Sequence, residues 1–140
     1  EIDAVLNYAF ARAEKLSCQI ETKIEVPENN FMPVFDLNVL LGNLLDNALE
    51  ALERAGSRYL YVSLRYGQGI FLVNIYNTFD GVIKKDGKRY LTRKPDGERH
   101  GIGLQNVEEI VDKYNGEIVR NVTDDMFKTD IVLYISAMPA

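Results

Sequence analysis

The sequence predicts an α/β domain built as a two-layer sandwich, in which helices cover a mixed, largely antiparallel sheet. Segments with apolar residues at helical spacing are interleaved with segments in which every second residue is apolar. Two pairs of these strand segments are separated by only a few residues and so form hairpins, which disfavours a doubly wound parallel sheet. The 140 residues are 46% apolar and show no repeat or internal boundary, so we expect one domain over residues 1–140.

The first half of the chain is predicted to contain a helix, a strand and a second helix. Residues 3–17 have apolar side chains at helical spacing, whereas residues 19–26 alternate with the period of a strand. The stretch PENNFMP, residues 27–33, is rich in turn formers. Asp36 is a favourable N-cap, and the second helix is expected to run from there to about Arg54.

The second half is predicted to contain a hairpin, a long loop, a helix and a closing pair of strands. Residues 78–100 have no convincing periodicity, and an irregular segment of that length in a small domain is often a functional lid. We therefore expect a mobile lid over about residues 78–100. The hairpin spans residues 59–77, the helix residues 101–116, and the closing strands residues 117–122 and 127–135.

Composition narrows the classes of function. The net charge is −5, which argues against nucleic acid as a partner. No apolar run approaches the length of a membrane span, and Glu1 in place of a methionine suggests a piece of a longer protein. A single cysteine, Cys18, excludes an internal disulfide framework and a cysteine-based zinc site. The lid segment holds seven basic and four acidic residues, a charge of +3 on a body of −8, which suggests an anionic ligand or a solvated loop.

A stripe of polar residues runs along the second predicted helix within LLGNLLDNALEAL. Asn43, Asp46, Asn47 and Glu50 stand at positions i, i+3, i+4 and i+7, opposite a wide arc of leucine and alanine. An amphipathic helix with a solvated face explains this spacing. Asparagine is nevertheless unfavourable inside a helix. Two amides and two acids on adjacent turns are oxygen ligands suited to Mg²⁺, if a phosphate supplies further ligands.

The stretch HGIGLQNV, from His100 to Val107, places two glycines where a loop becomes a helix. Gly101 and Gly103 allow the backbone to approach a ligand closely, and the first turn of the helix offers free N–H groups to an anion. A flexible hinge with tight helix packing would also use these glycines. Because the basic lid leads directly into them, we favour a phosphate site.

The strand FLVNIYN ends in an asparagine on its predicted core side. Phe71, Val73 and Ile75 alternate on one face, and Asn77 continues that face into the loop. Its amide would lie at the rim of an apolar pocket, where it could bind an exocyclic amine. An asparagine that simply initiates the turn is an equal alternative at this point.

Taken together, these motifs resemble the ATP-binding catalytic domain of sensor histidine kinases, within the GHKL superfamily. NLLDNALEA resembles the N box, NTFDG the first glycine box and HGIGL the second glycine box, in the expected order over nearly the whole chain. The amino-acid sequence of these motifs, together with YLTRK in the lid, is most similar to the Agr-type branch of Gram-positive peptide-sensing kinases. The resemblance implies the Bergerat-type ATP-binding fold.

The resemblance also implies roles for individual residues. Asn47 matches the magnesium-binding asparagine, with Asn43 and Glu50 as further possible ligands, and Asn77 matches the residue that reads the adenine amine. Asn43 and Lys94 are the expected catalytic residues, and Asn43 stands where hydrolytic relatives have a glutamate base. His100 is expected in the lid, near phosphate or in a structural role. The predicted nucleotide-binding set is Asn43, Asn47, Asn77, Thr92, Lys94, His100, Gly101, Ile102, Gly103 and Leu104.

One motif departs from the family pattern. The first glycine box normally reads DxGxG, whereas residues 77–81 read NTFDG, so Asn77 replaces the aspartate and Phe79 the middle glycine. A neutral amide accepts a weaker hydrogen bond than a carboxylate. We therefore expect weaker nucleotide binding than in typical relatives, and the role of Asp80 is open.

The function implied by the resemblance is binding of Mg·ATP and donation of its γ-phosphoryl group to a histidine on a separate dimerisation domain. The implied partners are that helical domain and a response regulator. The implied location is cytoplasmic, with the domain itself outside the membrane and the full-length protein anchored in it.

One alternative is a nucleotide-binding module of the same fold with weak or no catalysis. Another is an anti-sigma-type serine kinase, against which Asn43 argues, since those relatives carry an acid there. A small-molecule binder without preference for ATP is the remaining alternative.

Overall fold

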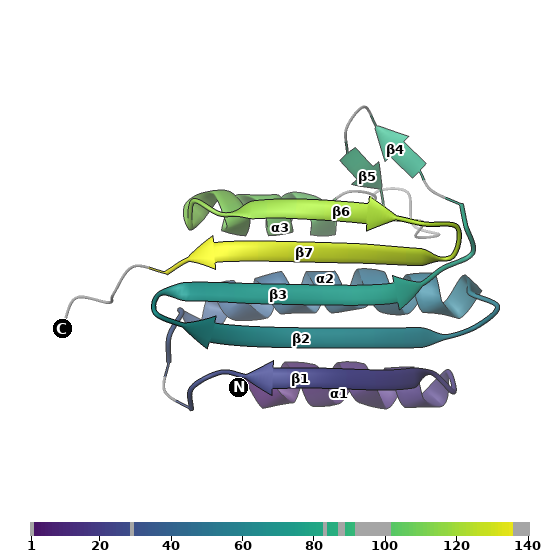
Figure 1. The fold of residues 1–140 in the computed structure, drawn as a ribbon, viewed down its shortest axis with the longest axis horizontal. Coiled ribbons are helices and arrows are strands. Elements are labelled where there is room, and N and C mark those ends of the chain that lie inside the picture. Colours follow the sequence, from purple (N-terminus) through teal and green to yellow (C-terminus); the bar gives the residue numbers. More distant parts are fainter. Residues whose placement is uncertain (1, 29, 83, 87–88, 92–101, 136–140) are drawn as a thin grey trace.

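The computed structural model describes residues 2–28, 30–82, 84–86, 89–91 and 102–135 of the chain. In this described part, one five-stranded sheet lies in front of three helices, which all cover the same face (Figure 1). The predicted two-layer α/β sandwich with a mixed sheet is confirmed. The strands are β1 (Gln19–Glu25), β2 (Tyr59–Gly67), β3 (Ile70–Thr78), β6 (Glu117–Val122) and β7 (Met126–Tyr134), and the helices are α1 (Ile2–Lys15), α2 (Val34–Arg54) and α3 (Ile102–Lys113).

The sheet has the strand order β1-β2-β3-β7-β6. β1 runs parallel to β2, and the other three pairings are antiparallel. β2 and β3 are joined by a two-residue loop, since Gly67 pairs with Ile70. Gln68 and Gly69 both have positive φ, 52° and 80°, as the tight turn of a hairpin requires.

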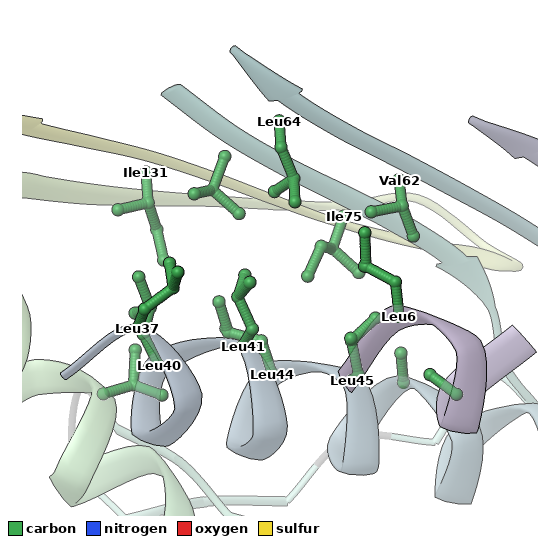
Figure 2. Packing of buried hydrophobic residues seen from close by; sticks show 14 of the residues in the cluster. Leu6, Leu37, Leu40, Leu41, Leu44, Leu45, Val62, Leu64, Ile75 and Ile131 are labelled. Atoms are coloured by element: carbon green, nitrogen blue, oxygen red, sulfur yellow. The ribbon is translucent and has the colours of Figure 1, made fainter. Parts of the chain in front are cut away.

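The core lies between the sheet and α2. In Figure 2, leucines of α2 and Leu6 of α1 point towards Val62, Leu64, Ile75 and Ile131 on the strands. Leu40 and Leu41 are fully buried, as are Val62 and Leu64. The apolar arc of α2 therefore faces the sheet, which leaves the polar stripe of this helix on its other side.

The predicted cap of α2 is wrong. The N-cap is Pro33, with φ −53° and ψ 132°, and Asp36 lies inside the first turn. Asp36 is buried, and its Oδ2 accepts hydrogen bonds from Lys113 Nζ at 2.8 Å and from the hydroxyl of Tyr114. Burial by itself would raise the pKa of Asp36, but these two hydrogen bonds and the charge of Lys113 outweigh it and lower the pKa. The carboxylate thus joins the start of α2 to the end of α3.

The end of α3 also differs from the predicted helix, which was expected to extend to residue 116. The helix ends at Lys113, and Asn115 adopts the left-handed conformation, with φ 54°. Gly116 is required for a different reason, because a Cβ atom there would lie 2.2 Å from the carbonyl oxygen of Val132. The backbone after α3 therefore packs directly against β7.

Part of the predicted lid is regular. The short strands β4 (Lys84–Asp86) and β5 (Arg89–Leu91) form an antiparallel pair of their own, above β6 in Figure 1. The expectation that residues 78–100 contain no secondary structure was wrong there. Residues 83, 87–88 and 92–100 of this segment lie outside the described residues.

Candidate functional site

The polar stripe of α2 is neither a fully solvated face nor part of the core. Asn43, Asp46, Asn47 and Glu50 are all half-buried. Asp46 accepts a hydrogen bond from the guanidinium of Arg12, at 3.1 Å from its Oδ1, and so ties α2 to α1. Sequence reasoning missed Arg12. The spacing of the stripe gave no sign that Asp46 is bound to a neighbouring helix.

The two asparagines of the stripe have different surroundings. Asn43 Nδ2 donates to the carbonyl oxygen of Val39 at 2.7 Å, one turn earlier in the same helix. This bond fixes the orientation of the carboxamide and leaves its oxygen as the acceptor for any ligand. Asn47 Nδ2 is buried and has no hydrogen-bond partner among the described residues.

An unpaired buried donor is costly, because the group has lost its water without gaining a partner. In native proteins such atoms usually receive a ligand, an ion or an ordered water. The carboxamide of Asn47 could offer its oxygen to a cation and its N–H to a phosphate oxygen. The orphaned atom on a half-buried polar stripe therefore indicates a binding site on this side of α2.

The residues of α2 fit Mg²⁺ only together with a phosphate. The described residues contain no group of three histidine, cysteine or carboxylate side chains that could hold a metal by themselves. Magnesium binds through one or two protein oxygens when phosphate and water complete its shell. Asn47, Asn43 and Glu50 provide such oxygens, so the donor set fits a phosphate-bound magnesium ion.

The end of β3 places Asn77 in the core layer. Asn77 is 5% exposed and follows the buried Val73 and Ile75 on the same face of the strand, as its position in the sequence predicts. Its Nδ2 donates to the carbonyl oxygen of Thr78 at 3.2 Å. Because the nitrogen makes this bond, the carboxamide oxygen is the atom available to accept from a ligand. Thr78 is held in turn, since its Oγ1 accepts from the N–H of Tyr59 at 3.0 Å.

The second glycine box lies at the start of α3. Ile102, Gly103 and Leu104 form the first turn of this helix. Val107, Ile110 and Val111 are buried, so this face of α3 belongs to the core. The other predicted ligands, Thr92, Lys94, His100 and Gly101, lie outside the described residues.

The candidate site residues lie on elements that are neighbours in the fold. α2 contacts both β3 and α3, and Figure 1 shows the end of β3 and the start of α3 on the same side of the molecule as the lid strands. The structure thus brings the polar stripe, Asn77 and the first turn of α3 to neighbouring elements.

A separate polar cluster, not foreseen from the sequence, lies on the sheet face without helices. Asp130 Oδ1 accepts from Tyr76 at 2.7 Å and from Asn74 at 2.5 Å. Burial, together with the hydrogen bond to Asp130 and its charge, raises the pKa of Tyr76 to about 12. Tyr76 also belongs to the lining of an open depression of about 460 Å³ on this face. The cluster lies on the opposite face of the sheet from α2 and takes no part in the candidate site.

Comparison with known proteins gives the class. A family model described as a GHKL domain matches residues 32–134, most of the chain. The chain belongs to the GHKL domain family, and this membership implies an ATP-binding domain. No curated protein matched the chain.

Three solved histidine kinases share this fold. The Acinetobacter baumannii histidine kinase AdeS superposes with a TM-score of 0.66 at 18% identity, over 97% of this chain and 64% of that one. The nucleotide-free catalytic domain of histidine kinase ThkA gives 0.68 at 15% identity, over 96% and 89%. The mycobacterial sensor histidine kinase MprB gives 0.66 at 18% identity, over 98% and 95%. At these identities the likeness establishes the fold, and the chain spans less than two thirds of the AdeS chain. No helix among the described residues combines the length and the apolar character that crossing a membrane requires.

Proposed function

We propose that this domain binds Mg·ATP and donates the γ-phosphoryl group to a histidine on a separate dimerisation domain. The observation that carries the proposal is the carboxamide nitrogen of Asn47, buried on the stripe of α2 and without a hydrogen-bond partner in the described part of the chain. Membership of the GHKL family and the motif order support it. When bound, magnesium supplies neutralisation of the phosphate charge, and the protein contributes mainly by positioning the reactants.

Each described site residue has a role in this proposal. Asn47 holds the metal through its carboxamide oxygen, with Asn43 and Glu50 as further possible ligands. The carboxamide of Asn43 cannot act as a general base, so the domain does not deprotonate a water molecule. The imidazole of the acceptor histidine is itself the nucleophile. Asn77 accepts from the exocyclic amine of adenine through the oxygen that its bond to Thr78 leaves available. The first turn of α3, with Ile102, Gly103 and Leu104, offers N–H groups to the phosphates.

The roles of the remaining residues rest on the sequence resemblance. Lys94 neutralises charge on the phosphates during transfer, and Thr92, His100 and Gly101 lie beside them. We also infer that residues 78–100 act as a lid over the nucleotide and that residues 1–140 are one catalytic domain of a longer kinase.

The partners of the domain follow from the same proposal. They are the kinase's own helical dimerisation domain and a response regulator. The amino-acid sequence of the three motifs supports membership of the Agr-type, peptide-sensing branch. A cytoplasmic catalytic domain of a membrane-anchored kinase is the corresponding location.

Two measurements test the proposal. Calorimetric titration with ATP, ADP and GTP, with and without magnesium, should show magnesium-dependent binding of ATP and a preference for adenine. Incubation with ATP and a dimerisation domain that carries the acceptor histidine should give phosphohistidine. Absence of ATP binding would refute the proposal.

A nucleotide-binding module without catalysis is the second candidate. The neutral Asn77 in place of an aspartate favours it, because weak binding limits turnover. Normal ATP binding without phosphohistidine formation would establish this second function in place of the first.

A further inference from the structure

Phe79 occupies the place where the family pattern has a glycine, and the structure gives it a defined environment. The side chain is 8% exposed. Its ring lies edge-on to that of Phe127 in β7, with the centroids 6.2 Å apart and the planes at 90°. The backbone N–H of Phe79 donates to the carbonyl oxygen of Asp125 at 3.0 Å. Phe79 is therefore held by both its ring and its backbone, in each case to residues that follow β6.

The residues after Phe79 are held to the same turn. Gly81 has a φ of 84°, and a Cβ atom there would lie 3.1 Å from the carbonyl oxygen of Asp124. The N–H of Val82 donates to Asp80 Oδ1 at 2.9 Å, which closes a local turn. We call residues 79–82 the anchor segment. It packs against the turn between β6 and β7, which the bond from Thr123 N to Met126 O, 2.9 Å long, keeps compact.

The anchor segment is directly connected to Asn77. Asn77 Nδ2 is held by the carbonyl oxygen of Thr78, and this carbonyl belongs to the peptide group that leads into Phe79. A shift of the Phe79 backbone would move the carbonyl and so change the aim of the Asn77 oxygen. Recognition by a single hydrogen bond is sensitive to such displacements, because the acceptor must be within a fraction of an ångström of its position.

We propose that Phe79 is a positioning residue for nucleobase recognition, and that its contact with Phe127 fixes the carboxamide of Asn77. This inference rests on the proposed function, in which Asn77 accepts from the adenine amine. In this proposal Phe79 acts through Asn77 and not by contact with the nucleotide. The turn between β6 and β7 thereby contributes to the selectivity for the base.

The test compares ATP and GTP binding by variants of this chain. Guanine has a carbonyl where adenine has its amine, so a misplaced Asn77 weakens ATP binding and leaves GTP binding unchanged. Phe79→Ala should weaken ATP binding about tenfold and lower the ATP-over-GTP ratio by the same factor. Phe79→Leu, which keeps an apolar side chain, should stay within about threefold of the parent. Phe35→Ala is the matched control, because this phenylalanine is 76% exposed.

A second comparison identifies the residue through which Phe79 acts. In an Asn77→Ala background the selectivity is already lost, so Phe79→Ala should cause no further change in the ATP-over-GTP ratio. A purely structural role would lower the melting temperature and leave this ratio at the parent value. That result, obtained with folded protein, would overturn the inference.

The outcomes distinguish this inference from the proposed function. If the parent chain does not bind ATP, the proposed function fails first. If the parent prefers ATP and Phe79→Ala keeps the full preference, only the role of Phe79 is refuted. Should Phe79→Ala fail to fold, Phe127→Leu carries the same test from the other side of the ring contact. An unchanged ratio in Phe127→Leu overturns the inference equally.

Discussion

Replacing Asn47 with alanine should separate stability from function. Asn47 Nδ2 is a buried donor for which the described residues provide no partner, and removing such a donor relieves a cost of about 1–3 kcal/mol. Alanine is also favoured over asparagine inside a helix by roughly 0.5 kcal/mol. The lost packing of the side chain opposes both terms. We therefore expect the free energy of unfolding to stay constant or rise by about 1 kcal/mol, while magnesium-dependent ATP binding is lost.

Urea denaturation followed by circular dichroism measures the stability, and calorimetry with and without magnesium measures the function. Asn38→Ala is the matched control, because Asn38 is exposed on the same helix and its replacement changes helix propensity alone. A destabilisation by Asn47→Ala of more than about 1.5 kcal/mol would show that the amide is hydrogen-bonded after all. Magnesium dependence that survives the change would refute the metal assignment.

Three further changes test other parts of the structure. Asn77→Asp should tighten ATP binding by about 1 kcal/mol, since a carboxylate accepts more strongly than an amide; an equal gain for GTP in the same titration would contradict this placement. Arg58 donates to backbone carbonyls at the ends of both α1 and α2, at 2.8–3.0 Å. Arg58→Ala should therefore cost about 3 kcal/mol in urea denaturation, against less than about 0.5 kcal/mol for Arg65→Ala on the exposed face of β2. The pKa of Tyr76 is raised from 10.0 to about 12, so its stabilising contribution is complete below pH 10 and is lost as the pH rises through about 12. Alkaline unfolding curves of the parent should show this loss, and Tyr76→Phe should reduce it. The contribution of Tyr59 and Tyr114, whose pKa values are also raised, should remain in the variant.

The fold could be predicted because its signals are local. Helical and alternating periods are visible within ten or so residues, and they gave the right kind of element for every helix and every strand of the main sheet. The pairings of β1 with β2 and of β3 with β7 were not predicted, since nothing local specifies which distant strands pair. The lid strands were missed for another reason. β4 and β5 have three residues each, too few for an alternating pattern to be recognised.

The errors at particular residues have one physical cause, namely contact between distant segments. Asp36 is a good helix cap by its local preference, but its partners Lys113 and Tyr114 lie 77 and 78 residues further along the chain. Asp46 belonged to the predicted cation-binding stripe, and its hydrogen bond to Arg12 spans 34 residues. In both cases a tertiary partner decided what the carboxylate does. The positions of the stripe and of Asn77 on their elements depend only on periodicity, and these the sequence could predict.

The two departures in the first glycine box act in opposite directions. Under the proposed function, the neutral carboxamide of Asn77 weakens the hydrogen bond to the base relative to a carboxylate. A glycine at position 79 would leave the following backbone free in the absence of nucleotide, and binding would then have to order it. Because Phe79 is buried against Phe127, this part of the backbone is already ordered before the nucleotide arrives. Compared with DxGxG, the motif NTFDG lacks the aspartate and the middle glycine. Its acceptor, Asn77, is weaker than an aspartate, but the backbone that follows it is fixed.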